Sequence, residues 1–222
     1  MALQTTVQTL NLSEDYSLVE DFFNKNFIAN LWQEVISLGK GEDFIDQYGV
    51  FKGRLISCQK FISPDNVNPL LESVLDQLRK FFVVPIVFRE IVYSTLYLPW
   101  DIHCDLVRTD SDHPFYNVLI PLHDVNSRTV IFNQKSPGYN DFYKYKKEFS
   151  KIKDCISEDF WNEYLSMCWA EDREYLSLKA LLPEQRAGQL IMFKRDLWHS
   201  SDNFHLKHNG PKHFIQIIVD KQ

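Results

Sequence analysis

The sequence has few of the residues from which common cofactor loops and nucleophile sites are built. Its 222 residues include seven glycines, and none of these forms a GxGxxG dinucleotide motif, a P-loop or a GxSxG nucleophile turn. Four cysteines, at positions 58, 104, 155 and 168, have no CxxC spacing. This spacing excludes a zinc ribbon and a dense disulfide framework, and it favours free thiols in a reducing compartment.

Long hydrophobic runs are also missing. The longest apolar stretch, Phe81 to Phe88, is far shorter than the about 20 residues that a membrane-spanning helix needs. No basic residue precedes Lys25, so a signal peptide is not expected. The net charge of -6 argues against nucleic acid as the main partner. These features predict a soluble, cytoplasmic protein without a membrane partner.

What the sequence does contain is 45% hydrophobic residues, enough for one large domain. Apolar spacing predicts helices over Ser17–Leu38, where Ser17 and Glu20 match a capping box, and over Val67–Phe82. β-Branched and aromatic segments then predict strands: "VVPIVFREIVYSTLYL", "YNVLIPL", "RTVIFNQ", "GQLIMF" and "HFIQIIV". A charged and aromatic block from Gly138 to Pro183 reads as a helical insertion between two strands. The fold class expected is α+β with a mainly β core.

One short motif suggests a metal site. In an extended segment His103 and Asp105 point to the same side, and Cys104 points to the other, where it would pack. His199 follows the glycine-led strand "GQLIMF" and supplies a third ligand. Two histidines and one carboxylate form the facial set that leaves three positions open on Fe(II). The alternatives are a surface pair at a turn, or His205 or His208 as the third ligand.

The "HCD" motif, the strand "AGQLIMF", His199 and a basic residue opening "KHFIQIIV" together resemble the Fe(II)- and 2-oxoglutarate-dependent oxygenases. The resemblance covers roughly Ile86 to Val219. It implies a double-stranded β-helix (jelly-roll or cupin-like) in a single domain over residues 1–222, with residues 1–85 as N-terminal helical support and the core over 86–219. The insertion, about 138–183, would be a lid or a substrate-recognition element.

The resemblance also implies Fe(II), 2-oxoglutarate as cosubstrate and O2. His103, Asp105 and His199 would be the catalytic metal ligands, and Lys212 would bind the distal carboxylate of 2-oxoglutarate. Family members often have a hydroxyl residue two positions after this cation, where this chain has Phe214. Alternatives for this cation are Arg195, Arg128 and Lys207. Asn117 and Thr129 are further candidates for cosubstrate binding. Tyr93, Tyr97 and Trp100 could line a substrate pocket, although aromatic residues on strands are more often core residues.

The reaction expected is hydroxylation with release of succinate and CO2. Asp105 argues against halogenation, because halogenating members of the family typically lack this carboxylate. The rival interpretations are a non-catalytic jelly-roll binding module and a cupin-like zinc hydrolase. No motif identifies the substrate, which could be a small molecule or a macromolecule, or the oligomeric state.

Overall fold

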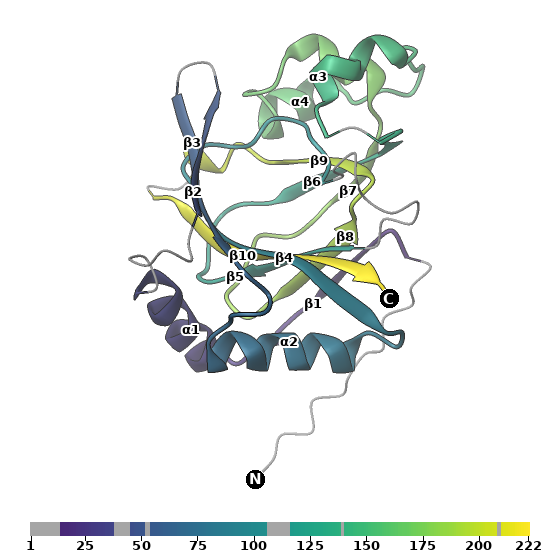
Figure 1. Ribbon diagram of the computed structural model, residues 1–222. Coiled ribbons are helices and arrows are strands. Elements are labelled where there is room, and N and C mark those ends of the chain that lie inside the picture. The colour runs from purple at the N-terminus through teal and green to yellow at the C-terminus, as the bar shows by residue number, and fades with distance from the viewer. Residues whose placement is uncertain (1–13, 38–44, 52–53, 106–115, 139, 208–209) are drawn as a thin grey trace.

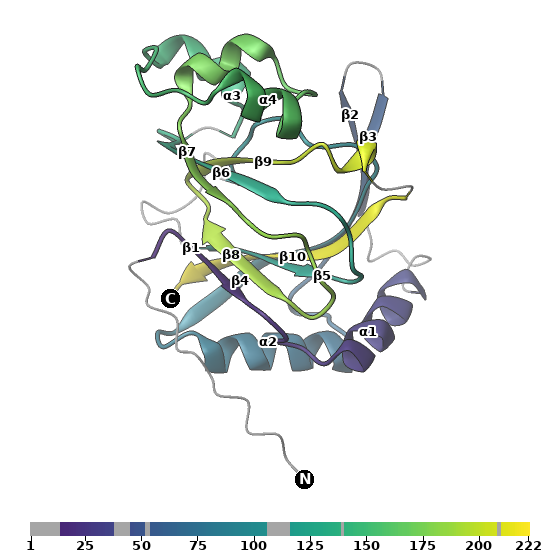
Figure 2. The same ribbon diagram turned by 180° about the vertical axis from the view of Figure 1, so that it is seen from behind.

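Two antiparallel sheets face each other and enclose the centre of the molecule (Figures 1 and 2). The structure is a computed structural model, and it describes residues 14–37, 45–51, 54–105, 116–138, 140–207 and 210–222. The large sheet has the order β1-β8-β5-β10-β4-β3-β2, and the small sheet has the order β7-β6-β9. The strands are β1 (Tyr16–Val19), β2 (Ile45–Phe51), β3 (Arg54–Ile62), β4 (Ile86–Leu96), β5 (Tyr116–Pro121), β6 (Thr129–Lys135), β7 (Leu178–Leu181), β8 (Leu190–Lys194), β9 (Leu197–Ser201) and β10 (Lys212–Lys221). This is the α+β, mainly β architecture that the sequence predicts.

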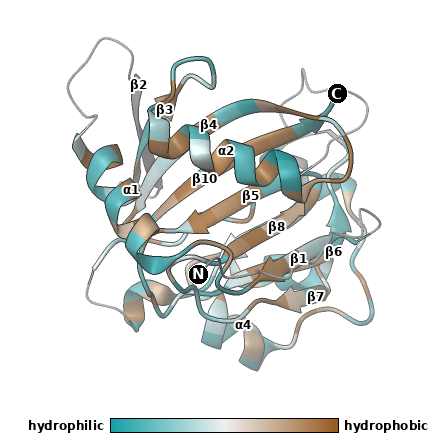
Figure 3. Ribbon diagram, turned by 90° about the horizontal axis from the view of Figure 1, so that it is seen from below, coloured by the Kyte–Doolittle hydropathy of each residue, from teal (hydrophilic) through white to brown (hydrophobic). Residues whose placement is uncertain are grey.

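Two helices cover the outer face of the large sheet: α1 (Lys25–Ser37) and α2 (Pro69–Phe81) (Figure 3). The side chain of Asn68 caps α2 by accepting a hydrogen bond from the backbone N–H of Leu71 (2.7 Å). Leucines of α2 pack on outward-facing residues of the central strands, such as Ile215 and Ile217 of β10. These strands are therefore buried on both faces, which explains their nearly continuous apolar sequences.

A second apolar cluster fills the space between the sheets, and a third lies beyond the small sheet. The third cluster joins β6 and β9 to the helical block, which comprises α3 (Phe142–Tyr145), the 3-10 turn η1 (Lys146–Glu148), α4 (Glu158–Tyr164) and the 3-10 turn η2 (Ala170–Tyr175). Trp198 and Phe142 meet edge to face at its centre, 5.4 Å apart. Cys104 is buried in this cluster, which confirms the predicted packing role.

The N-terminal region differs from the prediction. Residues Tyr16–Val19 form an edge strand paired with β8, so the helix predicted from Ser17 is wrong over its first part. The helix begins instead after Asn24, whose side chain accepts a hydrogen bond from the N–H of Asn26 (2.8 Å). The hairpin of β2 and β3 was not predicted either, so residues 1–85 are not purely helical support. Its strands extend the large sheet beyond β4.

The predicted insertion also needs a correction at its end. The block is helical in pieces as far as η2, but β7 within it pairs with β6 and belongs to the small sheet. Just before β8, Gly188 has φ +89°, and a Cβ there would lie 2.3 Å from the carbonyl oxygen of Phe23. Only glycine allows this close approach. Within the described part of the chain, no helix combines the length and apolar character that crossing a membrane would require.

Candidate metal centre

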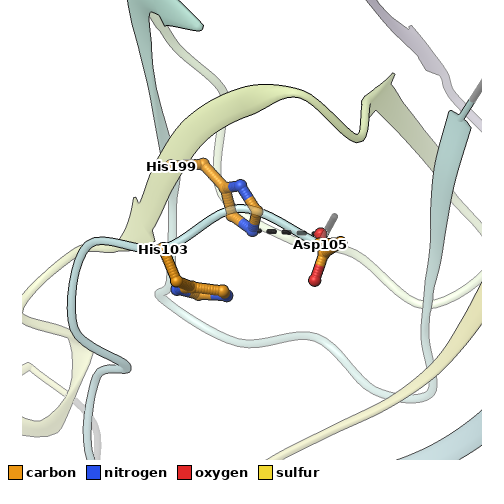
Figure 4. Close-up of side chains that lie close together, drawn as sticks. All are labelled: His103, Asp105 and His199. Carbon is orange, nitrogen blue, oxygen red and sulfur yellow. Dashed lines mark ion pairs between the residues drawn. The ribbon is translucent and has the colours of Figure 1, made fainter. Parts of the chain in front are cut away.

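The backbone places His103 directly opposite His199. The N–H of His199 donates to the carbonyl of His103 (2.8 Å), and the N–H of His103 donates to the carbonyl of His199 (3.1 Å). The two imidazole rings are 4.3 Å apart. Asp105 points toward them, with its Oδ2 3.4 Å from Nε2 of His199 (Figure 4). Strand β9 and the chain after β4 thus bring the three sequence-predicted ligands together, with one ligand atom from each residue lying within 4.8 Å of the other two.

Each histidine is fixed in the tautomer that suits a metal ligand. Nδ1 of His103 lies 2.6 Å from the carbonyl oxygen of Asp101, and Nδ1 of His199 lies 3.1 Å from that of Leu197. A carbonyl oxygen only accepts, so each Nδ1 carries a hydrogen, and in the neutral imidazole the lone pair is then on Nε2. Both Nε2 atoms are therefore available as ligands, with the ring orientation set by the second nitrogen.

Burial keeps His199 neutral. Its pKa is lowered to about 4, first by burial and then by the neighbouring His103, while Asp105 opposes the shift. The lone pair of Nε2 and the carboxylate oxygen of Asp105 consequently face each other as two acceptors. A cation between them would satisfy both, so the donor set fits a divalent metal ion such as Fe(II).

The carboxylate of Asp105 is held by amide side chains. Asn117 Nδ2 donates to Oδ2 (2.5 Å), and Gln216 Nε2 donates to Oδ1 (3.1 Å). The structure thus engages the amide nitrogen of Asn117 with Asp105, and a contact between Asn117 and a cosubstrate remains a prediction. Gln216 was not singled out from the sequence, because a glutamine on a strand carries no recognisable signal.

Arg195 fixes the main chain at the same ligand. Its Nη2 and Nε donate to the carbonyl oxygen of Asp105 (3.0 and 3.3 Å), and its Nη1 pairs with Asp220 (2.9 Å). Arg195 and Asp220 are 2% and 3% exposed, so this is a buried ion pair. Arg195 therefore has a supporting role at Asp105, which argues against its use as the cation for a cosubstrate.

Lys212 opens β10, as predicted, and is 2% exposed. Its Nζ donates to the hydroxyls of Ser201 (3.2 Å) and Ser127 (3.4 Å). Among the described residues no carboxylate forms an ion pair with it, and burial lowers its pKa to about 8, with a smaller opposing effect from Asp202. A buried ammonium that no carboxylate contacts directly can bind an anion.

The hydroxyl groups expected beside this cation come from elsewhere in the chain. Phe214 occupies the position two residues after Lys212, and its ring lies 5.2 Å from Nζ. Ser127 precedes β6 and Ser201 ends β9, so neither could be linked to Lys212 from sequence spacing. The small sheet thus supplies the polar partners that β10 lacks.

The other candidates fall into distinct environments. Arg128 and Lys207 lie beside carboxylates, 3.8 Å from Glu184 and 3.5 Å from Asp202. His205 is not part of the metal-ligand cluster, and His208 lies outside the described residues. The three aromatic candidates for the pocket differ in burial. Tyr93 belongs to the core under the helices, Tyr97 is 42% exposed, and Trp100 is half-buried beside His103.

A single cavity of about 710 Å³ contains both the ligand cluster and Lys212. Thr129 and Asn117 also line it. The volume falls within the range of about 300 to 1,000 Å³ typical of small-molecule sites. Its wall combines a possible metal site with an anion site, and both lie between the two sheets.

Comparison with known proteins gives matches in structure but not in sequence. No family model and no curated protein sequence matches the chain. Solved structures do match along nearly its whole length. SnoN from nogalamycin biosynthesis, in complex with Fe3+, alpha ketoglutarate and nogalamycin RO, is 10% identical with a TM-score of 0.56, covering 94% of this chain and 79% of SnoN.

Two further structures also match this chain. HygX from Streptomyces hygroscopicus, with nickel, 2-oxoglutarate and hygromycin B bound, is 10% identical with a TM-score of 0.53 (94% and 83% covered). A Pseudomonas putida prolyl-4-hydroxylase is 12% identical with a TM-score of 0.52 (95% and 94% covered). The chain has the fold of the Fe(II)- and 2-oxoglutarate-dependent oxygenases. The sequence-based resemblance to this superfamily and its double-stranded β-helix is thus confirmed at the level of fold, and the two-histidine, one-carboxylate cluster is present.

Proposed function

We propose that the protein is a non-haem Fe(II)- and 2-oxoglutarate-dependent oxygenase that hydroxylates a substrate not yet identified. The observation that carries this proposal is the presence, in one cavity, of the cluster His103, Asp105 and His199 and of the buried cation Lys212, which forms no ion pair within the described part of the chain. A binding module would need no such pairing of a metal site with an anion site. Bound iron would supply O2 activation coupled to decarboxylation of the 2-oxo acid and oxidation of a substrate C–H bond.

The side chains of the cavity would bind the metal ion at one end and the cosubstrate at the other. The Nε2 atoms of both histidines and Oδ2 of Asp105 would hold the metal ion on one face. Lys212 would bind the distal carboxylate of 2-oxoglutarate through a charge-assisted hydrogen bond, with Ser127 and Ser201 orienting its ammonium. Thr129 would line the cosubstrate end of the cavity. The apolar rings of Phe204 and Phe214 around Lys212 would exclude water and strengthen this bond.

We also propose a polar small molecule as the substrate. Besides the residues of the metal cluster and Lys212, the cavity wall has several side chains with hydrogen-bonding groups: Gln59, Arg89, Glu90, Asp101, Asn140, Asp141 and Tyr143. Two of the matched proteins have small molecules in their descriptions, nogalamycin RO and hygromycin B. The helical block contributes Asn140, Asp141 and Tyr143, which supports its proposed role in substrate recognition.

A related reaction at the same site is the second candidate. SnoN is described as an epimerase, and its fold matches this chain as well as a hydroxylase fold does. Product analysis separates the two, because hydroxylation adds one oxygen atom to the substrate and epimerisation leaves its mass unchanged.

The test begins without a substrate. Under anaerobic conditions the protein with Fe(II) should give a visible charge-transfer band when 2-oxoglutarate is added. Release of succinate, measured against pools of polar small molecules, should then identify the substrate. Absence of metal binding would favour the jelly-roll binding module, and hydrolysis supported by zinc would favour the hydrolase.

A further inference from the structure

A buried carboxylate lies next to the cosubstrate end of the cavity, outside its wall. Asp202 directly follows Ser201, the last residue of β9, and its side chain is 1% exposed. Ser201 and Lys212 line the cavity, whereas Asp202 is not among the lining residues. A ligand that approaches Lys212 from the cavity would therefore lie farther from Asp202 than the ammonium does.

Main-chain contacts fix Asp202 beside the two hydroxyls that contact Lys212. The N–H of Asp202 donates to the carbonyl of Arg128 (3.0 Å), and the N–H of Arg128 donates to Oδ1 of Asp202 (2.9 Å). These two residues directly follow Ser201 and Ser127, whose hydroxyls contact Nζ of Lys212 (3.2 and 3.4 Å). The pairing of two chain segments thus sets where the carboxylate lies relative to the ammonium.

The other charged and titratable groups around Asp202 are nearer to solvent. Nζ of Lys207, which follows the 3-10 turn η3 (Phe204–Leu206), lies 3.5 Å from Oδ2, and the Lys207 side chain is 36% exposed. Nζ of Lys207 also lies 4.8 Å from the ring of Tyr164 in α4, whose pKa responds to the charge of Asp202. The guanidinium of Arg128 lies beside Glu184 instead (3.8 Å). Solvent screens such exposed charges more than it screens buried ones.

Asp202 and Lys212 stabilise the charged forms of each other, although they form no direct ion pair in the described part of the chain. Burial lowers the pKa of Lys212 to about 8, and Asp202 opposes this shift. Burial raises the pKa of Asp202, and the N–H of Arg128 and the charges of Lys207 and Lys212 oppose that shift. Lys212 also makes a small contribution to the lowered pKa of His199.

We propose that Asp202 acts through Lys212 to limit how tightly the cosubstrate is held. This inference rests on the proposed function. In the empty site the carboxylate of Asp202 favours the ammonium form of Lys212. Once 2-oxoglutarate is bound, the same carboxylate repels the distal carboxylate of the cosubstrate. Because succinate retains this distal carboxylate, the repulsion also favours release of the product.

The two effects of Asp202 on affinity have opposite signs, and pH separates them. At pH 6 Lys212 is charged with or without Asp202, so removing the negative charge removes the repulsion and 2-oxoglutarate binds more tightly. Without Asp202 the pKa of Lys212 falls below about 8, so less ammonium remains at pH 9. This loss exceeds the gain from reduced repulsion, because Asp202 lies closer to the ammonium than to the ligand. Pyruvate has no distal carboxylate and should respond to neither effect.

The experiment compares Asp202→Asn with wild type and with Asp172→Asn. Asparagine keeps the shape of aspartate and an oxygen that can accept from the N–H of Arg128, but it has no charge. Asp172 is the matched control: it is also fully buried and paired with a lysine, Lys146 (2.5 Å), but it belongs to η2 in the helical block. Dissociation constants for 2-oxoglutarate and pyruvate are measured at pH 6 and pH 9 on the Fe(II)-loaded protein without oxygen. The ratio of the two affinities cancels changes at the metal end, which both acids use.

For Asp202→Asn we expect the ratio of 2-oxoglutarate to pyruvate affinity to be roughly threefold or more above wild type at pH 6 and below wild type at pH 9. Asp172→Asn should keep the wild-type ratio at both values. An unchanged ratio in Asp202→Asn, a shift in the same direction at both pH values, or the same crossing in Asp172→Asn would overturn the inference and leave the proposed function intact. If Asp202→Asn does not fold, Asp202→Ser is measured by the same criteria, since its hydroxyl can also accept from the N–H of Arg128. A wild-type protein that binds neither Fe(II) nor a 2-oxo acid would overturn both proposals.

Discussion

The two ends of the cavity are built in different ways. At the metal end, His103 and His199 are joined by main-chain hydrogen bonds, and each ring is oriented by a carbonyl two residues before it. At the other end, Lys212 is surrounded by side chains from separate segments: Ser127, Ser201, Phe204 and Phe214. Main-chain contacts persist through most substitutions nearby, whereas contacts between side chains do not. The metal end should therefore tolerate changes in its surroundings better than the cosubstrate end.

The largest effect should come from removing a ligand at the metal end. His199→Ala or Asp105→Ala takes away one of three ligand atoms. Each should weaken Fe(II) binding by more than roughly 100-fold, the upper end of what is lost when a residue that only hydrogen-bonds to a ligand is changed. The main-chain pairing of residues 103 and 199 does not need the imidazole, so the variants should still fold. Metal content after dialysis, with circular dichroism as the control for folding, checks both statements. Full metal content in both variants would show that the cluster is not the metal site.

Arg195, which holds the main chain at Asp105, should contribute to the free energy of unfolding. Arg195→Ala leaves Asp220 with the exposed Arg89 as its remaining ion-pair partner among the described residues. This change should destabilise the fold by about 3 to 5 kcal/mol, as expected when one member of a buried pair is lost. Urea denaturation measures this change. Arg79→Ala, which removes a surface partner of Glu72 and Asp76 on α2, is the matched control and should change stability by about 1 kcal/mol or less. Equal changes in the free energy of unfolding for the two variants would show that the buried ion pair of Arg195 stabilises the fold no more than a surface ion pair does.

The difference between the metal end and the Lys212 end of the cavity also explains which features could be predicted from the sequence. The metal end was predictable because residue types, alternation along an extended segment and a glycine-led strand are all local signals. The strand at Tyr16–Val19 was missed because the spacing of Leu18 and Phe22 imitates a helix, and pairing with β8 overrides it. The partners of Lys212 were missed because Ser127 and Ser201 belong to the segments of the small sheet, and only the tertiary fold places them beside a residue of the large sheet.

Lys212→Met tests the cosubstrate end by removing charge at nearly constant length. The lost charge-assisted bond should weaken 2-oxoglutarate by roughly 10- to 150-fold and leave Fe(II) and pyruvate binding unchanged. The melting temperature of the ligand-free protein should rise, because a buried ammonium with no direct ion pair among the described residues is replaced by an apolar group. Titration calorimetry with both acids and a thermal melt supply the measurements. Arg128→Ala is the control, and a selective loss of 2-oxoglutarate there would move the role to Arg128.

The smallest effect is a pH dependence that should be confined to the Lys212 end. Burial lowers the pKa of Lys212 from 10.5 to about 8 in the ligand-free protein. Affinity for 2-oxoglutarate should be level just below pH 8 and should fall by up to about tenfold per pH unit above it, because only the ammonium binds the carboxylate.

Stability should respond with the opposite sign. Between pH 8 and 10.5 the unfolded chain binds more protons at this lysine than the folded protein does, so this group makes stability rise with pH in that window. The ratio of 2-oxoglutarate to pyruvate affinity, measured from pH 7 to 9.5, isolates Lys212 from other titrating groups. Lys212→Arg stays charged throughout and should abolish the slope of that ratio. If the slope persists in Lys212→Arg, another group titrates, and the two ends of the cavity are not as separate as their construction implies.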